Sequence, residues 1–151
     1  MRVWRIALRK FRRFDGEGAR QYGGRWNHSG GSAVYTSESL SLAALELFVH
    51  FDTDLAPEDL VAIPAEIPDN VKIEHLETAM LPRNWRDFPA PEALKDIGSS
   101  WLVRNTTAIM SVPSALIPTE CNYLLNPKQK DFRRIRIGTP IPFRFDPRMW
   151  K

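Results

Sequence analysis

Residues 33–52 read AVYTSESLSLAALELFVHFD, a short apolar run followed at once by a longer, strongly apolar segment. The run 33–36 combines alanine, valine, tyrosine and threonine, and this composition favours a β-strand. Ser37 or Ser39 can then cap a helix by accepting hydrogen bonds from the free amides of its first turn. Because few polar residues follow, the pattern predicts a strand that leads directly into a largely buried helix over about 39–52.

The rest of the chain contains more predicted strands than helices. One further helix is expected from Pro91 to about Arg104, where apolar residues follow the helical period. Strands are expected at residues 2–8, 60–63, 71–74, 108–112, 135–137 and 141–145, residues 122–125 are extended or turn-like, and residues 15–24 and 78–91 are loops. Since strands and helices do not alternate regularly, the sequence predicts an α+β fold with a mixed or antiparallel sheet and few helices. A length of 151 residues fits a single domain that spans residues 1–151.

Composition excludes several classes of protein. A hydrophobic fraction of 43% and a charged fraction of 26% are typical of a soluble globular chain and not of a disordered one. The sequence has no run of about 18 apolar residues, and the basic residues after Met1 do not introduce a secretory signal. Cys121 is the only cysteine in the sequence and cannot form an internal disulfide. We therefore expect a cytoplasmic protein outside the membrane, in which Cys121 is a small buried hydrophobic residue.

The net charge of +3 is unevenly distributed along the chain. Residues 1–13 carry six cations and no acid, residues 128–151 carry eight cations and two acids, and residues 14–127 carry seven cations and 16 acids. Basic ends can bind a polyanion or a phosphorylated small molecule. They can equally lie in neighbouring strands, where their cations face water or pair with the acidic middle segment. The sequence leaves both interpretations open.

The common nucleotide and metal motifs are absent from the sequence. It has no Gly-x-x-x-x-Gly-Lys-Ser/Thr loop and no Gly-x-Gly-x-x-Gly after a predicted strand. The histidines at positions 28, 50 and 75 are isolated and form no zinc-binding pattern. We therefore expect no metal site, and candidate functional residues must come from less regular features.

One such feature is the stretch Gly23-Gly24-Arg25-Trp26-Asn27. Glycines let the backbone approach a ligand closely, and the guanidinium of Arg25 can bind phosphate or ribose oxygens with several donors. An arginine in a surface salt bridge is the alternative. Tyr35, at the end of a predicted strand, can stack against a flat ring or simply pack in the core.

Glu46 is a second candidate because its neighbours in the predicted helix are apolar. A carboxylate buried there needs a partner, and Arg25 is a natural one, unless Glu46 reaches solvent at an edge. Ser114 follows the end of a predicted strand, where functional sites tend to gather. Asn122 can bond to both backbone and ligand amides. Each of the last two residues, taken alone, is also typical of an ordinary turn.

Taken in order, these features resemble the RES-domain family, named for its Arg, Glu and Ser. The matching stretches are Gly23-Gly24-Arg25-Trp26-Asn27, Tyr35-Thr36-Ser37-Glu38 leading to Leu45-Glu46, Val112-Pro113-Ser114, and Asn122-Tyr123-Leu124-Leu125-Asn126-Pro127 followed by Asp131-Phe132. Each stretch is weak alone, but four in this order are specific and span essentially the whole chain. The family often has a His-Pro pair before the Asp-Phe, where this chain has Gln129-Lys130. That departure bears on local turn geometry more than on the chemistry.

The resemblance implies a fold similar to ADP-ribosyltransferases and a role as the toxin of a bacterial toxin–antitoxin pair. It implies NAD+ as the substrate and no metal. At the matching positions, the resemblance implies that the catalytic residues are Arg25, Glu46 and Ser114. It implies that the substrate-binding residues are Arg25, Tyr35, Ser114 and Asn122. The implied partner is an Xre-type helix-turn-helix antitoxin, through which alone the toxin would reach DNA. A homodimer within that complex is also implied.

Three functions remain open at this point. The first is degradation of NAD+ by hydrolysis or phosphorolysis, which causes growth arrest, and the second is ADP-ribosylation of a cellular protein. Both begin by cleaving the nicotinamide–ribose bond through an oxocarbenium-like state, which a carboxylate such as Glu46 can stabilise. The third, from another class of function, is nucleic-acid binding or RNA cleavage. It is suggested by the basic ends of the chain, which could bind a phosphate backbone.

Overall fold

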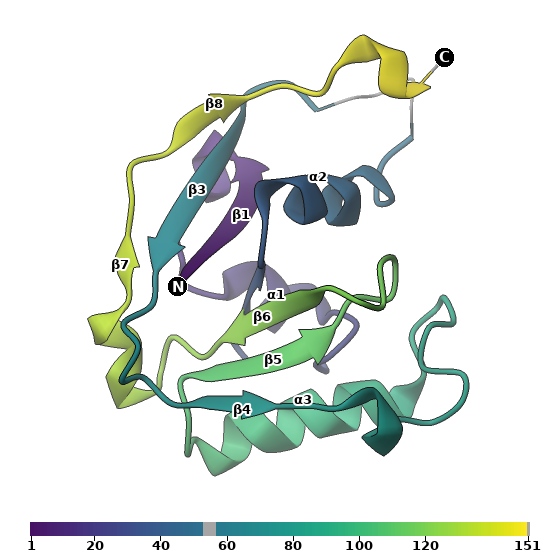
Figure 1. Cartoon of the computed structure of the whole chain (residues 1–151), viewed down its shortest axis with the longest axis vertical. Helices are drawn as coiled ribbons and strands as arrows, with labels where there is room; N and C mark the ends of the chain where they lie inside the picture. The colour runs from purple at the N-terminus through teal and green to yellow at the C-terminus, as the bar shows by residue number, and fades with distance from the viewer. Residues whose placement is uncertain (53–56, 151) are drawn as a thin grey trace.

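The computed structural model describes residues 1–52 and 57–150, and within this part of the chain eight strands form one sheet (Figure 1). The strands are β1 (Arg2–Leu8), β2 (Val34–Ser37), β3 (Leu60–Glu66), β4 (Ile73–His75), β5 (Ile109–Pro113), β6 (Cys121–Leu125), β7 (Arg136–Ile137) and β8 (Ile141–Phe143). Their order is β4-β5-β6-β2-β1-β3-β7, and β8 also pairs with β3. The pair β4–β5 is parallel and the other described pairs are antiparallel. The sheet is therefore mixed, and the predicted α+β class is confirmed.

In the described part of the chain, three α-helices pack around the sheet: α1 (Glu17–Tyr22), α2 (Leu40–Phe48) and α3 (Glu92–Arg104). Helix α2 lies beside β1, and α3 runs below β4 and β5 in the view of Figure 1. The same view shows β1 and β3 running steeply while β4, β5 and β6 lie nearly crosswise, so the sheet is strongly twisted. Within the described ranges, no helix has the length and apolar character needed to cross a membrane.

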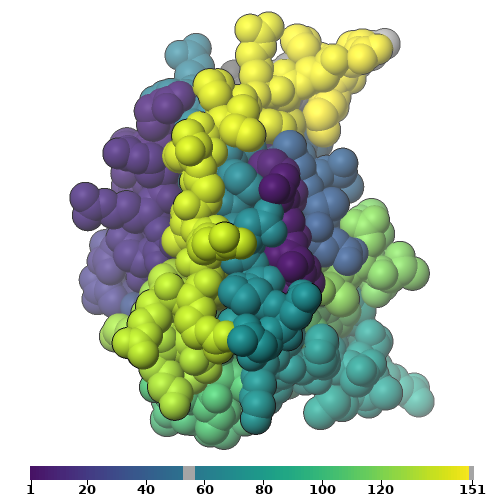
Figure 2. Space-filling model, turned by 60° about the vertical axis from the view of Figure 1, so that its left-hand side comes forward, coloured from purple at the N-terminus to yellow at the C-terminus, as the bar shows by residue number. Residues whose placement is uncertain are grey.

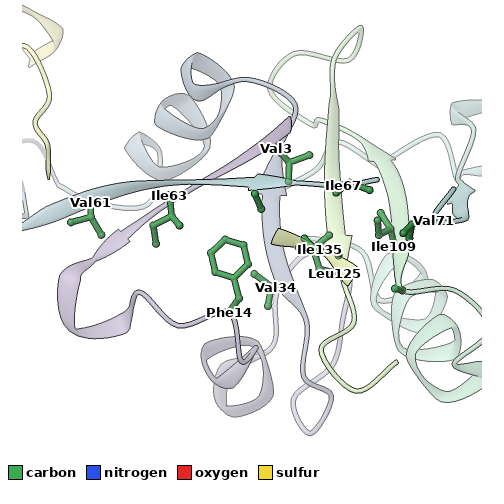
Figure 3. Packing of buried hydrophobic residues seen from close by; sticks show 12 residues of the cluster. Val3, Phe14, Val34, Val61, Ile63, Ile67, Val71, Ile109, Leu125 and Ile135 are labelled. Carbon is green, nitrogen blue, oxygen red and sulfur yellow. The ribbon is translucent and has the colours of Figure 1, made fainter. Parts of the chain in front are cut away.

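Two hydrophobic cores lie on opposite faces of β5 and β6. Neighbouring residues in a strand point to opposite faces, so Ile109 and Leu125 belong to one core while Met110 and Leu124 belong to the other. Phe14 packs among the strand residues of the first core (Figure 3). Because both faces are covered, every residue of β5 is buried, which explains why its sequence is almost entirely apolar.

The second core joins α3 to the loop that precedes β2. It contains Trp26 from that loop and Trp101 from the helix, both almost fully buried. A Cβ atom on Gly98 would lie 1.6 Å from the carbonyl oxygen of Trp26. The helix can approach the loop this closely only because residue 98 has no side chain.

Helix α2 is shorter and less buried than the sequence predicts. Ser39 caps it as expected, because its Oγ accepts a hydrogen bond from the amide of Leu42. The helix ends at Phe48, however, and within this fully described helix only Leu42 and Ala43 are buried, because another side of it borders a cavity. Beyond the helix the chain enters an aromatic cluster of Phe48, Phe51, Phe143 and Phe145.

The predicted loop at 15–24 is wrong, because it contains α1. The Asp15 carboxylate accepts a hydrogen bond from the amide of Glu17 at the first turn. Gly23, whose φ of +72° is unfavourable for other residues, follows the last residue. The glycines in this stretch hide a six-residue helix from a pattern-based prediction.

The strand predicted at 60–63 continues through Pro64 to Glu66. A proline has no amide hydrogen and normally ends a strand inside a sheet. Here β3 pairs with β8 through residues 60–62 and with β7 through residues 65–66. Pro64 therefore lies where the strand changes partner, so that no ladder hydrogen bond is lost.

The basic ends of the chain lie beside the same strand. β1 pairs with one edge of β3, while β7 and β8 pair with the other. Figure 2 shows the C-terminal segment crossing the surface beside the N-terminal residues. Arg2 forms an ion pair with Glu66, and Arg9 forms one with Asp59. These contacts favour the interpretation in which cations of the N-terminal segment pair with the acidic middle segment, whereas Arg134 and Arg148 pair with Asp131 and Asp146 of their own segment.

Replacing Gly98 by alanine is expected to lower the free energy of unfolding by about 2 kcal/mol, because the new methyl group collides with the Trp26 carbonyl. Urea denaturation followed by tryptophan fluorescence measures this change. The matched control is Gly18→Ala in α1, where no atom lies within 4 Å of the added Cβ. Equal stability of the two variants would contradict the close packing of α3 on the loop.

Candidate active site

The loop that carries Arg25 is closed on itself and anchored by Tyr35. Gly24 and Asn27 exchange two backbone hydrogen bonds. The Tyr35 hydroxyl accepts a hydrogen bond from the Trp26 amide at 3.0 Å and donates one to Asn27 Oδ1 at 2.6 Å. A Cβ at position 24 would lie 2.5 Å from this hydroxyl, which explains the glycine. Burial raises the pKa of Tyr35, so its hydroxyl stays protonated and remains a donor.

The side chain of Asn27 fixes the loop to its surroundings. It is only 1% exposed. Its Nδ2 donates to the carbonyl oxygens of Ala19, His28 and Gly31, at 3.1, 2.9 and 3.3 Å. One buried amide thus connects α1, the loop itself and the segment that leads to β2, and both of its polar atoms have partners.

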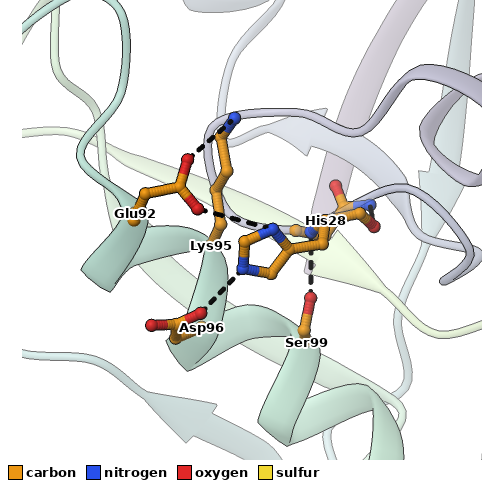
Figure 4. Close-up of polar contacts among 6 residues, drawn as sticks. His28, Glu92, Lys95, Asp96 and Ser99 are labelled. Atoms are coloured by element: carbon orange, nitrogen blue, oxygen red, sulfur yellow. Dashed lines mark hydrogen bonds and ion pairs between the residues drawn. The ribbon is translucent and has the colours of Figure 1, made fainter.

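His28 attaches the same loop to α3 (Figure 4). Its backbone amide donates to Ser99 Oγ at 2.9 Å, and its ring Nε2 lies 2.7 Å from Asp96 Oδ1. The other ring nitrogen, Nδ1, lies 3.7 Å from a carboxylate oxygen of Glu92, which also pairs with Lys95. The loop is therefore held by the helix on one side and by Tyr35 on the other.

The Arg25 side chain extends from this fixed loop toward the segment before α3. Its Nη1 donates to the carbonyl oxygens of Trp85 and Asp87, both at 3.0 Å. Its other guanidinium donors have no hydrogen-bond partner within the described chain, and the residue lines a cavity. Burial lowers the pKa of Arg25, and the nearby Glu46 opposes that shift. An arginine remains charged under these conditions and can bind an anion.

Glu46, on α2, is held from the other side of the cavity by two donors. Asn122 Nδ2 donates to Glu46 Oε1 at 2.7 Å, and Ser114 Oγ donates to the same oxygen at 2.8 Å. Among the residues that the structure describes, none hydrogen-bonds to the second oxygen, Oε2. The half-buried carboxylate thus has partners that offset its loss of water, and it keeps one oxygen for a ligand.

Ser114 and Asn122 are themselves fixed. Ser114 is fully buried, and its Oγ accepts hydrogen bonds from the amides of Leu116 and Ile117 at 3.1 and 3.0 Å. Asn122 Oδ1 accepts a hydrogen bond from Ser37 Oγ at 2.7 Å. The hydroxyl of Ser114 is therefore fully used in orienting the carboxylate, and it is not placed to act as a nucleophile.

A cavity of about 1220 Å³ brings these groups together. Four of the sequence-predicted residues line it, namely Arg25, Tyr35, Glu46 and Asn122, and Ser114 contacts the Glu46 carboxylate from behind. The other charged residues in the lining are Arg5, Glu17, Arg86 and Lys95. The volume exceeds that of most small-molecule sites, and the excess of cations favours a large anionic ligand.

Of the two interpretations of Glu46, the one in which Arg25 is its direct partner is wrong. Over the described residues 1–52 and 57–150, no ion pair joins Arg25 to Glu46, and the two attract each other only at longer range. Arg25 is instead bound by backbone carbonyls, and Glu46 by the neutral donors of Ser114 and Asn122. The two charged groups are thereby kept apart, with the cavity beside both.

Sequence reasoning missed Ser37, Asn27 and His28 as supporting residues. Ser37 is a possible helix cap in the sequence and part of a matched stretch, but the sequence does not indicate that it lies opposite Asn122 in the pairing of β2 with β6. Asn27 is part of the matched stretch, and its place beside two glycines is the signal that could have identified it. Nothing in the sequence indicates that His28 contacts α3.

Cys121 is partly exposed and not buried as expected, because it begins β6 near the surface. Partial burial, together with the carboxylates of Glu38 and Glu77, raises the pKa of its thiol. A protonated thiol is a poor nucleophile. Among the described residues, no group of three or more His, Cys, Asp or Glu side chains is arranged to hold a metal ion.

Replacing Tyr35 by phenylalanine is expected to lower the free energy of unfolding by about 2 kcal/mol, because the Trp26 amide and Asn27 Oδ1 both lose a buried partner. Thermal and urea unfolding measure the change. Tyr123→Phe is the control, since the Tyr123 hydroxyl makes no hydrogen bond within the described chain. If both variants unfold like the wild type, Tyr35 does not anchor the loop.

The fold and the arginine, glutamate and serine of this site define an RES-type domain. The RES domain model matches residues 2–146, nearly the whole chain. The chain belongs to the RES-domain family, which confirms the resemblance drawn from the sequence. It is 41% identical to a protein named Toxin Res from Yersinia enterocolitica, over 99% of each chain. It is also 36% identical to a Prs ADP-ribosylating toxin from Sphingobium sp., over 97% of this chain and 94% of that one.

A solved structure supports the fold independently. The chain superimposes on the crystal structure of the M. tuberculosis MbcT-MbcA toxin-antitoxin complex with a TM-score of 0.76. The match covers 94% of this chain and 83% of the other, at 16% sequence identity. At that identity the likeness concerns the fold. The family match and the relatives named Toxin Res identify the chain as a toxin of the RES class.

Proposed function

We propose that this toxin belongs to a toxin–antitoxin pair and causes growth arrest by breaking the nicotinamide–ribose bond of NAD+. The observation that carries the proposal is the Glu46 carboxylate, whose Oε1 is bound by Ser114 and Asn122 while Oε2 is left for a ligand. The relative named as an ADP-ribosylating toxin supports an enzyme that uses NAD+. The cationic lining of a large cavity supports a substrate with two phosphates.

The reaction needs little acid–base chemistry. The bond between ribose C1′ and the nicotinamide nitrogen breaks, and its electron pair leaves on the nicotinamide, which becomes neutral and needs no proton. The ribose develops positive charge, as in glycoside hydrolysis. Glu46 Oε2 stabilises that charge and orients the oxygen of water or phosphate that forms the new bond to C1′. The acceptor's proton passes to Glu46 or to solvent.

The other site residues bind or position. Arg25 uses its free guanidinium donors on the pyrophosphate, where paired hydrogen bonds to a charged oxygen are strong. Ser114 and Asn122 are positioning residues in this proposal, since they contact the Glu46 carboxylate. Tyr35 lines the cavity and holds the loop that presents Arg25, and in this proposal it also contacts the nicotinamide ring.

Glu46→Gln is expected to slow NAD+ consumption by at least about 100-fold, because the amide keeps the shape of the side chain without its negative charge. Purified protein is incubated with NAD+, with and without added phosphate, and the products are separated by chromatography. Phosphate dependence identifies phosphate as the acceptor.

The matched control is Glu58→Gln, which changes an exposed carboxylate outside the cavity. Arg25→Ala is expected to raise the KM for NAD+, and both site variants are expected to lose growth arrest when expressed. Normal NAD+ consumption and toxicity in a correctly folded Glu46→Gln protein would refute the proposal.

Transfer of ADP-ribose to a cellular protein is the second candidate, and the Sphingobium relative's name favours it. The same site serves both reactions, because only the acceptor differs. Labelled NAD+ added to a cell extract distinguishes them. A labelled protein band supports transfer, and release of free ADP-ribose or a phosphorylated sugar alone counts against it.

The partner in this proposal is an Xre-type helix-turn-helix antitoxin that covers the mouth of the cavity. A solved toxin–antitoxin complex with the same fold supports such a partner. In this arrangement the antitoxin binds DNA, and the toxin, as a homodimer within the complex, reaches DNA only through it. Co-expression of its Xre-type antitoxin is expected to restore the NAD+ level and to retain the toxin on a tagged antitoxin.

A further inference from the structure

Two aromatic side chains beside the cavity are unusually exposed. Tyr22 is 85% exposed and Phe88 is 82% exposed. Aromatic rings carry a large apolar area and are normally covered at least in part. Both residues line the same cavity as Arg25 and Glu46. Rings left open at a ligand cavity are available to stack on a flat group of the ligand.

The two rings flank Arg25 in the chain and in its contacts. Tyr22 is the last residue of α1, directly before the two glycines that lead to Arg25. Phe88 follows Asp87, whose carbonyl oxygen accepts a hydrogen bond from Arg25 Nη1. The rings therefore come from two segments that Arg25 itself connects.

The Glu46 carboxylate belongs to a different part of the cavity wall. It is bound by the end of β5 through Ser114 and by β6 through Asn122. A ligand that reacts at Glu46 and places its phosphates at Arg25 can extend past Arg25 to the two rings, which line the same cavity. In a dinucleotide the end that extends there is a purine base.

Charge around the rings is compatible with this ligand. Glu17, on the same helix as Tyr22, is neutralised locally by Arg20, whose hydrogen bond lowers the pKa of that carboxylate to about 2. Arg86 and Lys95 line the same cavity, but Lys95 is paired with Glu92, so Arg86 is the cation that matters here. Arg25 and Arg86, in the two segments that carry the rings, therefore supply positive charge that attracts phosphate groups.

We propose that Tyr22 and Phe88 form a stacking site for the adenine base of the substrate. This inference rests on the proposed function, because it takes NAD+ as the ligand. It makes the two rings specificity-determining residues, which select a dinucleotide over a mononucleotide that contains the same nicotinamide–ribose bond. Stacking of a base on an aromatic side chain is worth enough to support such selection.

The test compares NAD+ with nicotinamide mononucleotide, which keeps the scissile bond and one phosphate but lacks the adenosine. The variants are Tyr22→Ala, Phe88→Ala and the double variant. Removing each ring is expected to raise the KM for NAD+ roughly tenfold, in line with base–aromatic stacking, with kcat little changed. The kcat/KM for the mononucleotide is expected to stay the same, so that the preference for NAD+ disappears in the double variant.

Phe11→Ala is the matched control, since Phe11 is also an exposed aromatic residue, at 59%, but does not line the cavity. An equal loss with both substrates would overturn the proposal, because it would place the rings at the reacting end. An unchanged KM for NAD+ together with weaker binding of the antitoxin would also overturn it, and would assign the rings to the protein partner.

A binding measurement keeps this inference separate from the proposed function. ADP-ribose and ribose 5-phosphate are titrated into the wild-type and double-variant proteins by calorimetry. Tighter binding of ADP-ribose that is lost in the double variant supports the stacking site, even if the wild type consumes no NAD+ and the proposed reaction fails. Equal affinity for ADP-ribose in both proteins refutes the stacking site, even if NAD+ is consumed.

Discussion

A carboxylate on a partly buried helix must be hydrogen-bonded, and Glu46 imposes that requirement on the whole site. Its partners are Ser114, at the end of β5, and Asn122, on β6. Asn122 is in turn bound by Ser37 of β2. Helix α2 and the strands β2, β5 and β6 therefore have to be correctly placed relative to one another before the carboxylate can form its hydrogen bonds. The chemistry of the site depends on this, because both donors use the same oxygen and leave the other one open.

The second half of the site is built on a loop whose shape is fixed before any ligand binds. Asn27 holds the loop from inside, Tyr35 holds it from β2, and His28 holds it from α3. Gly98 allows the helix to approach closely enough for these contacts. Arg25 therefore extends from a rigid base, and a rigid base reduces the entropy lost when a side chain binds its ligand.

The cavity lies between these two supports and separates their charges. Arg25 and Glu46 do not neutralise each other, because carbonyl oxygens bind the arginine and neutral donors bind the glutamate. A cation and an anion kept apart in this way are both available to a ligand. A substrate that carries phosphates and, separately from them, a bond that develops positive charge suits that arrangement.

The sequence by itself determined the fold class, the long helix α3 and the order of the site residues, because these follow from local composition and from short motifs. It failed at α1, where glycines mask a helix, and at Pro64, whose place in β3 depends on the pairing of neighbouring strands. It also suggested Arg25 as the partner of Glu46, and within the described part of the chain the structure shows no ion pair between them. Only the tertiary structure decided that Glu46 is bound by Ser114 and Asn122, which lie 68 and 76 residues away in the chain. Contacts at such separations depend on strand register and helix packing, and no local pattern encodes them.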